Sequence, residues 1–223
     1  MAHRLIAEVI DEMGLRQEAI GVMPVGCACL SYAYWNIDNV HSAHGRAPAV
    51  ATGVKRCAPE RLVFAYQGDG DFASIGLAEA IHCANRGENI TTIFINNSIY
   101  GMTGGQMAPT TLPGMKATTA PAGRNPRTEG YPMKMCEILK ELEAPVLVER
   151  QALNNPKNIL KAKAAIKKAF GIQMNGGGYC FLELLSNCPT NWGLTPLKSL
   201  EWMEANSLPY FPLGTFKDKG VRA

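Results

Sequence analysis

Two short apolar segments on either side of one helical pattern restrict the fold of this chain more than any other feature. Residues 61–67 and 90–95 are apolar runs bounded by glycine or polar residues, as buried strands are. Residues 72–86, which lie between them, have the pattern of a helix. A strand–helix–strand connection is right-handed and makes its two strands parallel, so both strands end at the same edge of one sheet.

The same alternation continues along the chain and predicts the fold class. Strand patterns at 20–25, 146–149 and 179–185 alternate with helical patterns at 3–13, 46–56, 133–142, 156–170 and 197–205. We therefore predict an α/β fold in which helices cover both faces of a mostly parallel sheet. Residues 1–223 should form a single domain, with a long loop at about 108–132 and a C-terminal arm at about 207–223.

Composition argues against several classes of protein. The net charge is only +3, and basic residues gather only at 157–168, in a helical pattern, so we expect no nucleic-acid partner. No apolar run reaches the ~18 residues that a membrane span needs, and the first residues lack the pattern of a signal peptide. We therefore expect a cytoplasmic protein with no membrane partner. The odd count of seven cysteines argues against a disulfide framework.

Polar residues follow both strands at their common edge. Asp69 lies in the turn Gly68-Asp69-Gly70-Asp71 after the first strand, and Asn97 follows the second. Mg²⁺ prefers hard oxygen ligands and shares its shell with substrate phosphates. We expect a carboxylate oxygen from Asp69, an amide oxygen from Asn97 and the main-chain carbonyl of Ile99 as ligands. Each half alone is better explained as an ordinary turn or loop, but the pair favours a magnesium-diphosphate site.

The residues around Asp69 suit a bound diphosphate. Gly68 and Gly70 have no side chain to obstruct the approach of phosphate groups to the main chain. The predicted helix at 72–86 would direct unpaired N–H groups toward an anion. We include Gly68, Gly70 and Asp71 with Asp69 as cofactor-binding candidates.

Longer strings carry a family resemblance. The strings HSAHGRAPAVATG at 41–53, YQGDGD at 66–71 and NSIYGMTGGQ at 97–106 resemble the β subunit of 2-oxoacid:ferredoxin oxidoreductases, which use thiamine diphosphate (ThDP). The resemblance runs nearly end to end and includes NPKN at 155–158 and NCPTNWG at 187–193. It implies a ThDP-binding diphosphate domain with Mg²⁺. It also implies CoA-dependent oxidative decarboxylation of a 2-oxoacid, either 2-oxoglutarate or a branched-chain acid such as 2-oxoisovalerate, with ferredoxin as the electron acceptor.

The resemblance also suggests residue roles. His44 would donate a hydrogen bond to the diphosphate or to the substrate carboxylate, although a histidine that caps the next helix is the alternative. Met102 would lie beneath the bent cofactor, between its two rings, although core filling is the alternative. We assign His44 and Met102 as catalytic candidates. The loop candidates for cofactor binding are Asn97, Ile99, Tyr100, Gly101, Met102 and Thr103.

Cysteines depart from the family pattern. The family β subunit commonly holds one [4Fe-4S] cluster through four thiolates. Cys27 and Cys188 match two of these positions, and the first cysteine pair of the family has no counterpart. Three explanations of the missing pair stay open. They are a start that lies upstream, which we favour, ligands from Cys29 or another chain, and loss of the cluster. The other cysteines fall in helix or strand patterns and should be buried apolar residues, namely Cys57, Cys83, Cys136 and Cys180.

The resemblance further implies partner subunits. In this family a glutamate that activates the cofactor comes from the pyrimidine-binding domain of an α subunit, and no residue of this chain matches it. Further expected partners are γ and ferredoxin-like δ subunits, ferredoxin, the 2-oxoacid and coenzyme A. Two rival functions stay open at this point. One is the diphosphate-binding half of a non-oxidative ThDP decarboxylase or synthase, and the other is a non-catalytic assembly subunit.

Overall fold

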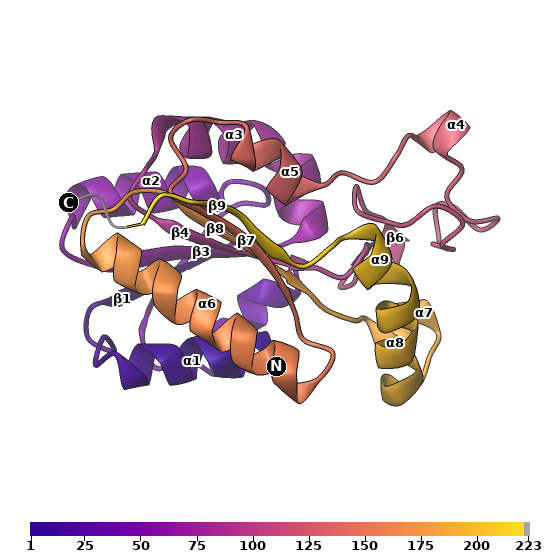
Figure 1. Ribbon diagram of the computed structural model, residues 1–223, viewed down its shortest axis with the longest axis horizontal. Helices are drawn as coiled ribbons and strands as arrows, with labels where there is room; N and C mark the ends of the chain where they lie inside the picture. The colour runs from indigo at the N-terminus through magenta and orange to yellow at the C-terminus, as the bar shows by residue number, and fades with distance from the viewer. Residues whose placement is uncertain (221–223) are drawn as a thin grey trace.

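A seven-stranded sheet forms the centre of the computed structural model, which describes residues 1–220 (Figure 1). The strand order is β2-β1-β3-β4-β8-β7-β9. All neighbours pair in parallel except β9, which is antiparallel to β7. The predicted α/β class with a mostly parallel sheet is therefore confirmed. The strands are β1 (Ala19–Met23), β2 (Asp38–His41), β3 (Leu62–Gly68), β4 (Thr91–Asn96), β7 (Leu147–Ala152), β8 (Cys180–Leu185) and β9 (Gly214–Asp218).

Helices cover both faces of the sheet. α1 (Ala2–Glu12) and α6 (Pro156–Met174) pack on one face, and α2 (Ala47–Cys57), α3 (Leu77–Arg86) and α5 (Met135–Lys140) pack on the other (Figure 1). Side chains along a strand point alternately to the two faces. In β3, Phe64 joins the core beneath α1 and α6, whereas Val63 and Ala65 join the core beneath α2 and α3. Both faces are apolar, as a central parallel strand requires.

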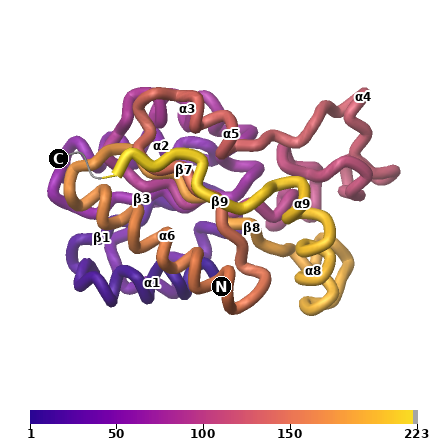
Figure 2. The backbone as a smooth tube through the Cα atoms, viewed as in Figure 1, coloured from indigo at the N-terminus to yellow at the C-terminus, as the bar shows by residue number. Residues whose placement is uncertain are grey.

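The smaller elements lie mostly beyond the carboxyl ends of β4 and β8. At that end of the molecule the chain leaves the sheet twice, in the segment that contains α4 and in the segment from α7 to α9 (Figure 2). The smaller elements at this end are the hairpin β5 (Ile99–Tyr100) and β6 (Gln106–Met107), α4 (Pro126–Glu129), α7 (Pro189–Trp192), α8 (Pro196–Trp202), the π-helix η3 (Met203–Ser207) and α9 (Leu208–Tyr210). The 3₁₀ helix η1 (Cys27–Ala33) follows β1, and the π-helix η2 (Asp71–Ile75) follows β3.

Two predicted segments differ from the structure. The helix expected at 72–86 is divided into η2 and α3, with Gly76 between them. A Cβ atom on Gly76 would lie 2.2 Å from the carbonyl oxygen of Gly45, so the helix is interrupted where the turn at Gly45 packs against it. The C-terminal arm expected at about 207–223 contains β9, an edge strand with the charged residues Lys217 and Asp218. Charged side chains are typical of exposed sheet edges and weaken the strand pattern in the sequence.

The end of that predicted arm, residues 221–223, lies outside the described residues. Within residues 1–220, no helix has the combination of length and apolar character that crossing a bilayer would require.

Candidate magnesium and diphosphate site

One pocket lies where the strands β1, β3 and β4 end. Every cofactor-binding candidate from the sequence lines it, together with His44 and Cys27, whereas Cys188 does not. The topology explains this meeting, because the ends of parallel neighbours lie at the same edge of the sheet. Its lining residues are Val25, Gly26, Cys27, Ala28, His44, Tyr66, Gly68, Asp69, Gly70, Asp71, Ile95, Asn97, Ile99, Tyr100, Gly101, Met102 and Thr103.

Asp69 lines this pocket and is buried, with only 2% of its surface exposed. The Gly70 N–H donates to Oδ1 at 2.9 Å, and the Thr110 hydroxyl donates to Oδ2. Burial raises the pKa of Asp69 to about 6, and the hydrogen bonds from Thr110 and the main chain only partly oppose this. A cation beside Asp69 would stabilise the charged carboxylate. The donor chemistry therefore fits a divalent metal ion.

The loop after β4 carries an unusual backbone conformation. Ser98 has a φ of +60° and is the one non-glycine residue with positive φ among residues 1–220. This conformation costs an ordinary residue roughly 1–2 kcal/mol. It lies between Asn97 and Ile99, the two predicted ligands from this loop. The Asn97 Oδ1 atom accepts a hydrogen bond from the Ile99 N–H at 3.3 Å, so one turn joins both groups.

Gly68 and Gly70 are required for different reasons. A Cβ atom on Gly70 would lie 2.2 Å from the ring of Tyr100, whose hydroxyl donates to the Gly70 carbonyl at 2.9 Å. Position 70 therefore requires glycine because the Tyr100 ring packs against it. A Cβ atom on Gly68 would meet no protein atom within 4 Å, although Gly68 lines the pocket. Gly68 leaves room that a phosphate group can use.

Asp71 holds the turn that carries His44. Its Oδ1 accepts from the His44 ring nitrogen Nδ1 and from the Gly45 N–H at 2.6 Å, and its Oδ2 accepts from the Gln67 amide. Burial raises the pKa of Asp71, while the bonds from Gln67 and His44 oppose that rise. Both carboxylate oxygens are thus occupied by protein donors. Because Nδ1 faces Asp71, Nε2 is the His44 atom that remains for other contacts.

Two cysteines converge beside the pocket. The sulfur atoms of Cys27 and Cys188 would each lie 3.5 Å from a Cβ atom on Gly101. Burial, and secondarily the nearby Cys188, raise the pKa of the Cys27 thiol. The Asn191 amide bridges the Cys188 sulfur, at 3.3 Å, and the Gly101 carbonyl, at 2.8 Å. Within the described part of the chain, no three or more His, Cys, Asp or Glu side chains are close enough together to hold a metal ion. The two predicted thiolates therefore meet without a third such ligand.

The remaining cysteines divide between the core and the surface. Cys83, Cys136 and Cys180 are fully buried, as predicted. The prediction for Cys57 is wrong, because this residue is exposed. Cys57 is the last residue of α2 and lies off the buried stripe of that helix, which runs through Ala47, Ala51 and Lys55.

Several residues that shape the site were not predicted. The Thr111 hydroxyl donates to the Ser98 carbonyl at 2.6 Å, next to the contact of Thr110 with Asp69. The Trp192 indole N–H donates to the Asn97 carbonyl at 3.2 Å. Both threonines come from the long loop, where no periodic pattern marks them. The string at 187–193 contains Trp192 and was the only available signal for it.

Comparison with known proteins identifies the fold as a thiamine-dependent enzyme domain. The family model "Thiamine pyrophosphate enzyme, C-terminal TPP binding domain" matches residues 24–184. Thiamine pyrophosphate is another name for ThDP. The chain belongs to this family of thiamine pyrophosphate enzymes.

Individual relatives confirm the more specific resemblance. The ketoisovalerate oxidoreductase subunit VorA of Methanothermobacter thermautotrophicus is 50% identical over 98% of this chain. The 2-oxoglutarate synthase subunit KorB of Methanocaldococcus jannaschii is 38% identical over 90% of this chain and 72% of its own length. The chain spans about half the length of VorA, 46%.

A solved structure supports the fold. The 2-oxoglutarate:ferredoxin oxidoreductase of Magnetococcus marinus superposes with a TM-score of 0.79 at 24% sequence identity. The match covers 99% of this chain and 80% of that chain. At this identity the likeness establishes the arrangement of the elements.

Proposed function

We propose that this chain is the Mg–ThDP-binding subunit of a 2-oxoacid:ferredoxin oxidoreductase. With partner subunits it would carry out the CoA-dependent oxidative decarboxylation of a 2-oxoacid and pass electrons to ferredoxin. The observation that carries this proposal is that Asp69, Asn97 and Ile99 line the same pocket at the ends of β3 and β4. Relatives named as 2-oxoacid oxidoreductase subunits support the choice of reaction.

The roles of the chain's own residues follow from the pocket. When bound, ThDP supplies the nucleophilic carbon and the electron sink for decarboxylation. Asp69 and the Asn97 amide would hold the magnesium ion with the Ile99 carbonyl. Gly68 would admit the diphosphate.

Two further pocket residues have proposed contacts. Met102, whose side chain is half-exposed beside the pocket, would support the cofactor rings. His44, held through Nδ1 by Asp71, would present Nε2 to the diphosphate or to the substrate carboxylate.

We propose a branched-chain 2-oxoacid as the substrate to test first. The relative with 50% identity carries the name ketoisovalerate oxidoreductase, and the 2-oxoglutarate enzyme subunit is 38% identical. 2-Oxoglutarate is the second candidate.

Partner subunits would complete the active site. Large apolar side chains are exposed at the pocket and in the neighbouring segment that includes η1, which is typical of a surface covered by another polypeptide. They are Val25, Leu30, Tyr32, Tyr34 and Met102. We propose that an α subunit with a pyrimidine-binding domain contributes the activating glutamate, with γ and δ subunits in the same complex.

Cys27 and Cys188 would supply two ligands to one [4Fe-4S] cluster, and the two further thiolates would come from Cys29 or another polypeptide. All seven cysteines are unpaired in the structure. We therefore propose a cytoplasmic location, where thiols stay reduced.

The test is a cofactor and activity measurement on the purified native complex. We expect one ThDP per copy of this chain, iron in the complex, and CoA-dependent reduction of a viologen dye that is fastest with 2-oxoisovalerate among pyruvate, 2-oxoglutarate and 2-oxoisovalerate. Decarboxylation without an electron acceptor would favour the non-oxidative alternative. Bound ThDP with zero dye reduction for all three acids would favour the assembly subunit and end the oxidoreductase proposal.

A further inference from the structure

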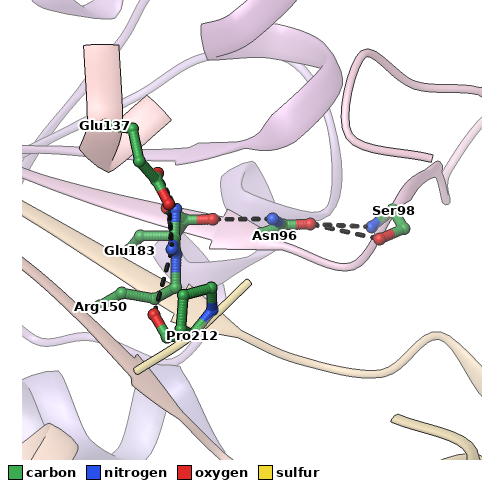
Figure 3. A network of polar contacts seen from close by, with 6 residues as sticks. All are labelled: Asn96, Ser98, Glu137, Arg150, Glu183 and Pro212. Carbon is green, nitrogen blue, oxygen red and sulfur yellow. Dashed lines mark hydrogen bonds and ion pairs between the residues drawn. The ribbon is translucent and has the colours of Figure 1, made fainter. Parts of the chain in front are cut away.

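A network of buried polar groups connects strands β7 and β8 to the loop after β4 (Figure 3). Arg150 on β7 and Glu183 on β8 are both fully buried, and the Arg150 Nε donates to the Glu183 Oε2 at 2.8 Å. The other oxygen of Glu183 accepts from the Asn96 Nδ2 at 2.7 Å. The Asn96 Oδ1 in turn accepts from the main-chain N–H of Ser98, at 3.2 Å, and from its hydroxyl, at 3.4 Å.

The charge on Glu183 fixes the direction of the Asn96 amide. An ionised carboxylate only accepts hydrogen bonds, so Asn96 must turn its NH₂ group toward Glu183 and its oxygen toward Ser98. Arg150 forms a salt bridge with Glu183, so both carboxylate oxygens of Glu183 act as acceptors. A reversed amide would set oxygen against oxygen at Glu183 and nitrogen against the Ser98 N–H. The ion pair therefore determines that the Asn96 oxygen, and not its NH₂ group, faces the loop.

Every charged group of this network has a partner. Arg150 also donates to both oxygens of Glu137, at 3.0 and 2.6 Å, and to the Pro212 carbonyl at 3.1 Å (Figure 3). A buried ion pair of this kind usually adds little stability over apolar residues of the same size. Stability by itself is a weak reason for such a costly arrangement in the core. A positioning task explains it better, because the network ends at Ser98, a non-glycine residue with positive φ that lies between two proposed metal ligands.

We propose that Arg150 and Glu183 are positioning residues for the metal site. Through Asn96 they hold Ser98 in its left-handed conformation, and this conformation sets the Asn97 side chain and the Ile99 carbonyl for the cation. The inference deepens the proposed function and rests on it, since it assumes that the loop binds Mg²⁺ with ThDP. Neither Arg150 nor Glu183 lines the pocket, so their effect on the metal would pass through the loop.

The test separates metal affinity from stability. The native complex, freed of cofactor by chelation, is titrated with Mg²⁺ at saturating ThDP by calorimetry, and the melting temperature is measured without ligand. The double variant Arg150→Met/Glu183→Leu replaces the ion pair by apolar residues. We expect it to melt within a few degrees of the wild type, while its Mg²⁺ affinity falls about 10-fold, ~1.4 kcal/mol.

Two loop variants test the same link without touching the ion pair. Asn96→Ala should lower the Mg²⁺ affinity about as much as the double variant does. Adding Ser98→Gly to Asn96→Ala should recover most of that loss, because glycine adopts positive φ without strain. The loop variants also keep the proposal testable if the double variant fails to fold.

Gln173→Met serves as the matched control. Gln173 is equally buried, accepts from the Thr91 hydroxyl and donates to the Val63 carbonyl, at the opposite end of the sheet from the pocket. This variant should lower the melting temperature and leave the Mg²⁺ affinity unchanged.

The outcomes are distinct. If the wild-type complex binds no Mg–ThDP, the proposed function itself fails. If it binds normally and both Asn96→Ala and the double variant bind equally well, the positioning role is overturned while the proposed function stands. If Asn96→Ala loses affinity and Ser98→Gly restores none of it, the step through Ser98 is overturned.

Discussion

The proposed metal site is built from two sides that are held in different ways. On the sheet side, Asp69 and Asn97 follow β3 and β4, whose parallel register is fixed by main-chain hydrogen bonds that pair Gly68 with Ile95. On the loop side, Thr110 and Thr111 come from a long segment with little regular structure. The main-chain positions of the sheet side therefore depend on many repeated bonds, whereas the loop side must depend on a few particular ones.

A single arginine orders the loop side. Arg124 is 5% exposed, and its guanidinium donates to main-chain carbonyls on both arms of the segment. These carbonyls belong to Ala108, Pro109, Thr111, Glu129, Gly130 and Tyr131. The bonds close the segment onto itself and bring Thr110 and Thr111 to Asp69 and Ser98. Substitution of Arg124 alone should therefore disrupt the conformation of the loop side and leave the sheet side unchanged.

The largest effect is expected at the sheet side, from Asp69→Ala. This change deletes the one anionic ligand proposed for the cation, so Mg²⁺ affinity at saturating ThDP should fall by at least about 100-fold. Calorimetric titration of the complex measures this loss, and circular dichroism should report an intact fold. Unchanged affinity would mean that the metal lies elsewhere.

On the loop side, Arg124→Ala should free the segment at 108–131. Several carbonyls lose a donor, each worth about 1 kcal/mol, so hydrogen exchange of the segment should accelerate by roughly 100-fold. Amides of β3 and β4 should exchange as in the wild type. Arg127→Ala, at an exposed arginine in the same segment, is the control and should change neither. Faster exchange throughout the sheet would show that the two sides are not independent.

The cost of the buried carboxylate can be measured with Asp69→Asn. The pKa of Asp69 is raised from 3.8 to about 6 in the folded chain, so ionisation opposes folding. Folding instead favours the protonated carboxyl group of Asp69. The stability that this preference adds is complete below pH 3.8 and is lost as the pH rises through about 6.

Asp69→Asn should therefore raise the free energy of unfolding of the ligand-free chain by up to about 3 kcal/mol at pH 7. The gain should grow between about pH 4 and 6 and then level off. Denaturant titrations at several pH values measure it. A gain that is the same at pH 3.5 and pH 7 would contradict the assigned cause.

The two glycines of the Asp69 turn offer the smallest effects. Gly70→Ala would press a methyl group into the Tyr100 ring and should lower the free energy of unfolding by about 2 kcal/mol. Gly68→Ala meets no protein atom within 4 Å, so it should leave stability nearly unchanged and weaken ThDP binding. Thermal melting and calorimetry of the two variants separate the effects. Equal destabilisation by both would refute the distinction between a packing glycine and a cofactor-facing one.

The sheet side was predictable from the sequence, because strand periodicity and the right-handed crossover bring the ends of β3 and β4 together whatever the loops do. The loop side was not. Thr110, Thr111 and Arg124 act through single bonds between residues without a repeating pattern, and no local rule indicates which carbonyls an arginine will reach.

Residue roles were harder to predict than residue positions. Asp71 was expected to bind cofactor, and it lines the pocket, but its carboxylate oxygens are occupied by His44, Gly45 and Gln67. Tyr100 was a cofactor candidate, and its hydroxyl donates to the Gly70 carbonyl. Hydrogen-bond partners of this kind depend on tertiary contacts that the spacing of residues along the chain does not encode.

The most direct measurement is anomalous diffraction from crystals of the complex grown with Mn²⁺, as a heavier substitute for Mg²⁺, and ThDP. We predict one manganese peak within about 2.5 Å of an Asp69 carboxylate oxygen, the Asn97 Oδ1 and the Ile99 carbonyl oxygen, with diphosphate oxygens in the same shell. A manganese peak beside the diphosphate but away from Asp69 and Asn97, or ThDP bound outside this pocket, would contradict the account.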